Sequence, residues 1–136
     1  MDFDGWTIAE RPRPRAYRRE GLYASLNSRG EIVLSERAYK KIWEPGSVTL
    51  LWDAEHRRIG VKFPLAGEDH FFPARRYGRG RRLYIIRASK MLRQFGIEIT
   101  ETIKFPEAHI ILINEKPMLV LDLNTALKLN GVPASM

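Results

Sequence analysis

Short apolar runs separated by turn residues are the feature that most constrains what this chain can fold into. From Leu22 onward each run has the length of a strand and none has the length of a long helix. The runs 48–52 and 59–63 flank the polar turn at 53–56 and predict a hairpin. The strand-like runs are residues 22–26, 32–34, 48–52, 59–63, 83–86, 100–105, 109–113 and 118–123. This pattern predicts a β-rich α+β domain.

Two segments between these runs show helical features instead. Ser35 is a good N-cap for a short helix over Glu36–Trp43, and Pro45-Gly46 would end it. Trp43, at the end of this helix, is expected in the core. In the second segment apolar residues recur at i, i+3, i+4 and i+7, as Ala88, Met91, Leu92 and Phe95. The chain therefore alternates short strands with two short helices.

The order of these segments suggests an internal repeat. At a shift of 52 residues Arg29 matches Arg81, and the strand 32–34 matches 84–86. We interpret this as two similar β-α-β-β units, about 22–63 and 79–123, packed about a pseudo-twofold axis because neither could bury its apolar face alone. The alternative is that any two β-α-β-β stretches align by chance.

Outside the units the sequence predicts connecting and terminal segments of one domain. With 136 residues the chain is near the commonest domain size. Residues 1–21 contain RPRPRAYRR and predict a flexible arm, either solvated or lying along phosphates. Residues 64–82 are rich in Pro, Gly and Arg and predict a basic connection. Residues 124–136 predict a short C-terminal turn and tail.

The excess positive charge is concentrated in one stretch. The chain carries a formal charge of +7, and residues 75–90 hold seven Lys or Arg and no acid. The remaining residues hold 16 basic and 16 acidic side chains, so they sum to zero. A dense cationic patch on an otherwise balanced domain favours a polyanionic partner. Arg is suited to this role because its planar, permanently charged guanidinium can meet phosphate with two hydrogen bonds.

The first unit resembles a known family. Its matching features are Arg29, Gly30, the strand 32–34, the helix to Trp43, and the run Pro45-Gly46-Ser47-Val48. In these features it is similar to the SpoVT/AbrB/MazE swapped-hairpin DNA-binding domain. Ser35 stands where that family usually has Pro, and the Leu-Gly after the helix is missing. The second unit, about 79–123, keeps Phe95-Gly96-Ile97 but lacks the Pro-Gly.

The resemblance implies a fold and a DNA-binding face. It implies that the two units form a pseudo-symmetric, swapped-hairpin-like barrel in one chain, where family members usually use two chains. Basic residues flanking the first strand and helix line the DNA face in the family. Those positions here are Arg29, Arg37, Lys40 and Lys41 in the first unit and Arg81, Arg82, Arg87 and Lys90 in the second. Together with the charged connection, the candidate nucleic-acid-binding residues are Arg29, Arg37, Lys40, Lys41, Arg75, Arg76, Arg79, Arg81, Arg82, Arg87 and Lys90.

Other residue types point away from catalysis and cofactors. Without cysteine the chain has no disulfide or thiolate metal site, which fits a reducing cytoplasm. The three histidines are scattered without metal-ligand spacing, and no nucleophile elbow or phosphate loop is present. The N-terminus lacks the apolar core of a signal peptide, and the longest apolar run is too short to cross a bilayer. We therefore expect a cytoplasmic protein that is not an enzyme, needs no cofactor and uses neither a membrane nor a small-molecule substrate.

The sequence thus predicts a non-catalytic DNA-binding protein that prefers duplex DNA. It would act as a small prokaryotic or phage-type transcriptional regulator by occupying a site, and a homodimer would double the contact area. Two alternatives stay open. One is a protein-interaction module, antitoxin-like or scaffold, whose basic loop meets an acidic protein. The other is an RNA-binding β-domain that stacks bases on Tyr77 and Tyr84.

Overall fold

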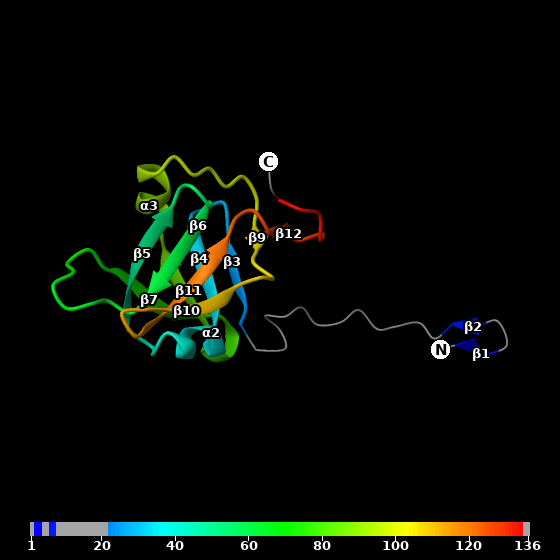
Figure 1. The fold of residues 1–136 in the computed structure, drawn as a ribbon, viewed down its shortest axis with the longest axis horizontal. Coiled ribbons are helices and arrows are strands. Elements are labelled where there is room, and N and C mark those ends of the chain that lie inside the picture. The colour runs from blue at the N-terminus through cyan, green and yellow to red at the C-terminus, as the bar shows by residue number, and fades with distance from the viewer. Residues whose placement is uncertain (1, 4–5, 8–21, 135–136) are drawn as a thin grey trace.

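The computed structural model describes residues 2–3, 6–7 and 22–134. Most of the arm predicted over 1–21 therefore lies outside the described residues. Its two described pieces, β1 (Asp2–Phe3) and β2 (Trp6–Thr7), pair as antiparallel strands. Everything else discussed below belongs to residues 22–134, drawn in colour in Figure 1.

These residues form one antiparallel sheet with two short helices, which confirms the β-rich α+β fold class. The strand order is β10-β11-β6-β5-β7-β8-β4-β3-β9-β12. The two end strands do not pair with each other, so the sheet is open and the predicted closed barrel is wrong. The strands are β3 (Ala24–Leu26), β4 (Glu31–Ser35), β5 (Ser47–Asp53), β6 (Arg58–Lys62), β7 (Phe72–Tyr77), β8 (Leu83–Arg87), β9 (Ile103–Lys104), β10 (His109–Ile113), β11 (Lys116–Asp122) and β12 (Leu127–Lys128).

Strands β4 and β8 form the central pair. Val33 faces Ile85 in an antiparallel register, with Ile32 opposite Ile86 and Leu34 opposite Tyr84. Burial alternates along both strands as the two-residue period of a strand requires, so Ile32, Leu34, Tyr84 and Ile86 enter the core. Because the strands run in opposite directions, the segments that follow them leave at opposite ends of the sheet.

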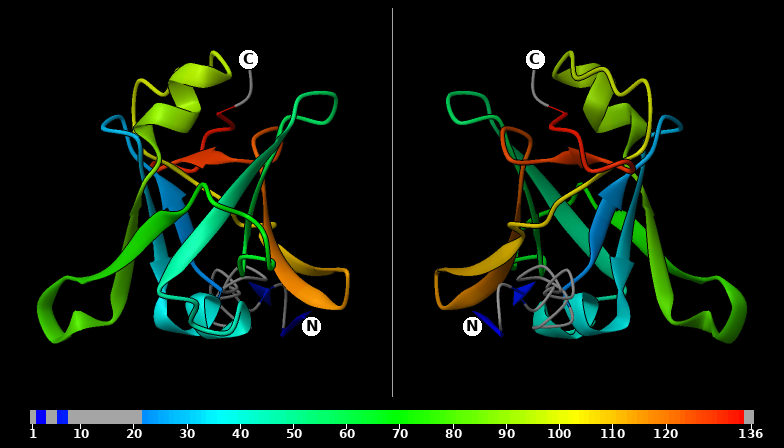
Figure 2. Two further views of the ribbon diagram at one scale, coloured as in Figure 1. Left: turned by 90° about the vertical axis from the view of Figure 1, so that its left-hand side faces the viewer. Right: turned by 90° about the vertical axis from the view of Figure 1, so that its right-hand side faces the viewer.

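A helix follows each of these strands. Helix α2 (Glu36–Lys41) begins where expected, and the Ser35 hydroxyl accepts a hydrogen bond from the backbone N–H of Ala38 at 3.2 Å. Helix α3 (Ser89–Gln94) buries Met91 and Leu92. The two helices lie at opposite ends of the molecule, α3 at the top and α2 at the bottom of Figure 2. Any surface built on one helix is therefore remote from the other.

The connection predicted over 64–82 is partly a strand. Residues 72–77 form β7, which pairs with β8 along most of its length and with β5 at its start. Phe72 and Ala74 are half-buried in alternation, but the adjacent Arg75 and Arg76 hid this pattern in the sequence. A short 3-10 turn, η1 (Arg79–Arg81), links β7 to β8. The basic stretch is consequently a hairpin rather than a loop.

The C-terminal segment also belongs to the sheet. Leu127 and Lys128 form β12 and pair with β9, which itself spans only Ile103–Lys104 of the predicted strand 100–105. Side chains from β3 to β11 share a single core with both helices. Its largest fully buried members are Phe105, Leu22, Leu26, Ile32, Leu34, Ile42, Ile59, Ile86, Leu119, Leu121 and Val48. One core through both predicted units means that residues 22–134 fold as one body.

Candidate nucleic-acid interface

The predicted binding residues do not form one surface. They divide between the two ends of the β4–β8 pair because those strands are antiparallel. At one end, which we call the α2 end, lie helix α2 and the tip of the β7–β8 hairpin. At the other, which we call the α3 end, lie Arg29, Arg87 and Lys90. The described side chains of the α2 end are Arg37, Lys40, Lys41, Arg76, Arg79 and Arg82.

Two further predicted residues, Arg75 and Arg81, belong to the β7–β8 hairpin but are not among these side chains. Arg75 pairs with Ile85 on β8 while Arg76 pairs with Tyr84, and neighbouring residues of a strand point to opposite faces. Arg75 therefore lies on the outer face of the hairpin, away from α2. Arg81 lies in η1 at the hairpin tip, and its side chain is outside the described part of the structure.

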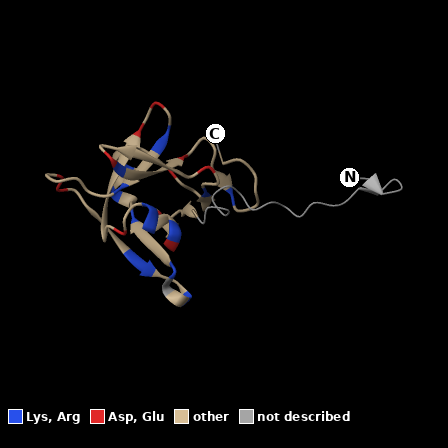
Figure 3. Ribbon diagram, turned by 60° about the horizontal axis from the view of Figure 1, so that its bottom comes forward, with Lys and Arg blue, Asp and Glu red and all other residues tan. Residues whose placement is uncertain are grey.

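A single carboxylate joins the two elements of the α2 end. Glu36 lies 3.4 Å from the Lys40 ammonium and 3.9 Å from the Arg76 guanidinium on β7. The backbone N–H of Glu36 also donates to the carbonyl of Arg82 at 3.0 Å. The start of α2 is thus fixed against the hairpin, and the cations of both elements lie together in Figure 3.

A stacked pair of tyrosines also joins helix α2 to the β7–β8 hairpin. Tyr39 of α2 and Tyr84 of β8 stack with ring centroids 3.9 Å apart, and the Arg76 guanidinium lies 5.2 Å from the Tyr84 ring. The Tyr39 hydroxyl accepts a hydrogen bond from the backbone N–H of Gly46, and burial raises the pKa of this phenol. Helix, hairpin and the turn after the helix are therefore held by one residue.

The tip of the hairpin carries exposed cations. Gly78 and Gly80 both have positive φ, 88° and 78°, which permits the tight return between the strands. The side chains of Arg79 and Arg82 are exposed and make no ion pair with any other described residue. Figure 2 shows the hairpin projecting beyond the sheet on the side of α2. These two guanidiniums are available to an external anion.

The α3 end is electrostatically different. The Arg29 guanidinium lies 3.1 Å from the Glu31 carboxylate, which also accepts from the Asn27 amide at 2.9 Å. The hydrogen bond from Asn27, followed by the hydrogen bond and charge of Arg29 and the charge of Arg87, lowers the pKa of Glu31 against the cost of burial. One of the three cations at this end, Arg29, is therefore paired with a carboxylate of the protein.

The aromatic residues Tyr84, Tyr77 and Trp43 differ in their exposure to solvent. Tyr84 is 5% exposed, within the stack described above, so it cannot receive a base. Tyr77 is 55% exposed on the hairpin. Trp43, which the sequence placed in the core, is 51% exposed with a φ of 71°, and packs against Phe63 with centroids 5.6 Å apart. That prediction is wrong because the chain turns away from the core after Ile42.

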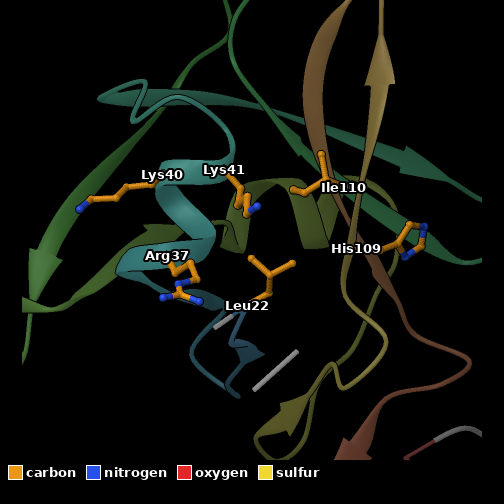
Figure 4. Close-up of a pocket in the computed structure, with 6 residues that line it drawn as sticks. All are labelled: Leu22, Arg37, Lys40, Lys41, His109 and Ile110. Atoms are coloured by element: carbon orange, nitrogen blue, oxygen red, sulfur yellow. The ribbon is translucent and has the colours of Figure 1, made fainter. Parts of the chain in front are cut away.

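A cleft of about 720 Å³ adjoins the α2 end. It lies between α2 and the edge strand β10, as Figure 4 shows. Its six lining residues are Leu22, Arg37, Lys40, Lys41, His109 and Ile110. The His109 ring bonds through Nδ1 to the Glu107 carbonyl at 2.9 Å, so this nitrogen is the donor. His109 and Ile110 were not predicted as site residues, because nothing in their spacing connects them to a helix about 70 positions earlier.

Comparisons with known proteins give no family assignment. No family model, no curated protein and no solved structure matches this chain. Across residues 2–3, 6–7 and 22–134, no three His, Asp or Glu side chains are grouped so as to hold a metal ion. In the same part of the chain no helix is long and apolar enough to span a bilayer.

Proposed function

We propose that this protein binds duplex DNA, without catalysis, through the cations of the α2 end. The observation that carries the proposal is the charge imbalance there: six described Lys or Arg side chains lie with two carboxylates, Glu36 at the start of α2 and Glu44 just after its end. Each cation that meets a phosphate releases counterions, so affinity would fall steeply with salt. The role of a small cytoplasmic regulator that acts by occupying a site is part of this proposal.

The shape of the α2 end favours duplex over single strands. The major groove admits a narrow β element, and the tip of the β7–β8 hairpin, which lies beyond the pairing of β8 with β4, carries exposed arginines that would enter it. Helix α2 is held beside it through Glu36 and would meet the flanking backbone. In this arrangement Arg79 and Arg82 enter the groove while Arg37 and Lys40 contact phosphates.

The strand pairing supports the proposed relation to the swapped-hairpin family. Strand β5 follows α2 but pairs at its start with β7, which lies in the predicted connection 64–82, and β9 follows α3 but pairs with β3 of the first unit. At the centre, Val33 and Ile85 are 52 positions apart and face each other. We propose that the chain is an in-chain, pseudo-twofold version of that arrangement in an open sheet. The second unit then begins at β7 rather than at residue 79, and the β10–β11 hairpin is an addition to it.

A matched pair of triple variants tests the DNA proposal. Arg79, Arg81 and Arg82 are changed to Ala in one variant, and Arg29, Arg87 and Lys90 in the other. Binding of duplex DNA is measured by fluorescence anisotropy between about 50 mM and about 200 mM salt. The hairpin variant should lose affinity sharply, and its slope of log affinity against log salt should be smaller by about three. The α3-end variant removes the same charge and should change the slope little.

If both variants lost the same DNA affinity, binding would depend on net charge alone, and the assignment of the interface to the α2 end would be wrong. An unchanged slope in the hairpin variant would remove the hairpin from the interface. Single-stranded RNA is a second candidate that the exposure of Tyr77 favours. Preference for a single strand over duplex, lost in Tyr77→Ala, would replace the duplex proposal with that one.

A further inference from the structure

The two edges of the sheet are covered to different degrees. Strand β12 is two residues long, and the chain's own C-terminal segment lies against it: the Lys128 N–H donates to the Val132 carbonyl at 2.8 Å. A short strand that contains Lys is a typical protected edge. Strand β10 is five residues long, contains no Lys, Arg or Pro, and pairs with β11 alone among the described strands. Its other edge therefore offers main-chain N–H and C=O groups that have no strand partner within residues 22–134.

The cleft described above runs beside this open edge. His109 and Ile110 of β10 form one wall, α2 forms the other, and Leu22 lies between them in Figure 4. Its volume of about 720 Å³ is in the range of ligand-binding pockets. Ile110 packs partly on the core, whereas Leu112, two residues further along the same face, is 70% exposed. An occupant of the cleft would meet both main-chain groups and apolar side chains on the β10 side.

The helix wall of the cleft is cationic. Arg37, Lys40 and Lys41 line it, and none of the six lining residues is acidic. Lys40 is partly engaged by Glu36, but Lys41 makes no ion pair with the other described residues. Cations on one wall and unpaired backbone on the other define the chemistry of the occupant.

We propose that the cleft binds an extended acidic peptide segment of a partner protein, which adds to the sheet as a strand beside β10. Main-chain hydrogen bonds would give affinity, as in other strand-addition complexes. Every second side chain of the added strand would point to the same face as Ile110, toward α2, where carboxylates meet Arg37 and Lys41. A nucleic-acid backbone has phosphates for the helix wall but no N–H donors for the β10 carbonyls, so the peptide fits both walls better.

The test uses the full chain, labelled with nitrogen-15, and a synthetic peptide of about eight residues that alternates Val and Glu. In NMR titrations with peptide up to low-millimolar concentration, the amide chemical shifts should change mainly for residues of α2 and β10. The same peptide N-methylated at every residue keeps its charge but cannot form strand hydrogen bonds, and it should not bind. A Val-Lys peptide should not bind either.

Two double variants separate the cleft from the hairpin. Arg37→Ala with Lys41→Ala should weaken peptide binding by about tenfold or more, because two charge-assisted contacts are lost. Arg79→Ala with Arg82→Ala removes the same charge from the same end of the molecule and should leave peptide affinity almost unchanged. Both variants should weaken duplex DNA, because Arg37 is also proposed to contact phosphate, but only the first should weaken the peptide, so failure of either proposal can be recognised separately.

Four outcomes overturn the inference. Equal binding of the N-methylated peptide would show simple charge attraction without strand addition. Shifts in α2 and β10 caused by a short oligonucleotide, with none from the acidic peptide, would assign the cleft to nucleic acid. Self-association that Leu112→Lys abolishes would assign the edge to a second copy of this chain. If none of these probes changed the amide chemical shifts, the cleft would not bind the proposed class of ligand.

Discussion

Helices α2 and α3 follow the two central strands and each bury two residues, yet they differ in almost every other respect. Ser35 caps α2 with a side-chain hydrogen bond, whereas Ala88 gives α3 none. Helix α2 adjoins the open edge of the sheet and the cationic hairpin tip. Helix α3 adjoins the turn at Gly30, where a Cβ would come within 2.9 Å of Ser89. Related backbone positions therefore support an exposed, charged surface at one end and a tightly packed junction at the other.

This difference shows how a symmetric topology can leave only one end free to bind. At the α3 end Arg29 and Glu31 form an ion pair. At the α2 end six described cations outnumber Glu36 and Glu44, and the exposed Arg79 and Arg82 make no ion pair with another described residue. The distinction lies in the side chains, because the strand pairing at the centre is shared by both ends.

The largest expected contrast between the ends is in stability. Tyr39→Ala should cost about 4 kcal/mol, because it removes a fully packed ring that stacks on Tyr84 and accepts from Gly46. Leu92→Ala, at the related position of α3, should cost about 2.5 kcal/mol because Leu92 is slightly exposed and makes no such network. Urea unfolding measures both. Tyr39→Phe keeps the ring and should cost about 1 kcal/mol. A smaller loss in Tyr39→Ala than in Leu92→Ala would contradict the proposed junction.

The second contrast concerns the caps. Ser35→Ala should destabilise the protein by about 1.5 kcal/mol, since the hydroxyl accepts from both Ala38 and Tyr23 backbone N–H groups. The cap cannot be transferred to α3. Ala88 is fully buried with φ −107° and ψ 11°, unlike the extended Ser35, so Ala88→Ser should cost about 1 kcal/mol rather than add stability. Thermal unfolding of both variants checks the sign, and a stabilised Ala88→Ser would show that α3 is simply missing a cap.

Much of the fold could be predicted because its signals are local. The hairpin at 48–63, the cap at Ser35 and the turn at Pro45-Gly46 each depend on a few neighbouring residues. The 52-residue shift aligned the two central strands, but it did not predict that they pair with each other. Strand β7 was missed because its two adjacent arginines break the apolar alternation on which strand prediction depends.

The candidate site was harder to predict because it depends on long-range pairing. The sequence suggested one basic surface, but antiparallel β4 and β8 send Arg29 and Arg82 to opposite ends of the sheet. The cleft joins Leu22, α2 and β10, three segments far apart in the chain. Only the order of strands in the sheet reveals that β10 is an edge. Composition identified the charged side chains without showing which of them a partner could reach.

A third contrast concerns Glu31, the half-buried acid of the α3 end. The pKa of Glu31 is lowered in the folded protein, so its charge contributes stability above the ordinary carboxyl pKa of 4.5. That contribution is lost as pH falls through the lowered value. Glu31→Gln should therefore cost about 1 kcal/mol at neutral pH, and the difference from the natural chain should vanish in acid. Urea unfolding across the acid range, with the exposed Glu98→Gln as control, tests this; a difference that persists at low pH would assign the loss to packing.

The smallest effect is a gain in binding. Glu36→Gln removes the carboxylate that lies between α2 and the β7–β8 hairpin, so duplex DNA should bind about threefold more tightly at low salt. The gain should disappear at high salt, because screening weakens the repulsion that Glu36 exerts on phosphate. Glu31→Gln removes an equal charge from the α3 end and should leave DNA affinity unchanged in the same anisotropy assay. If the two variants gain equally, the field of the whole molecule, and not its local surface, sets the affinity, and the functional distinction between the two ends would be lost.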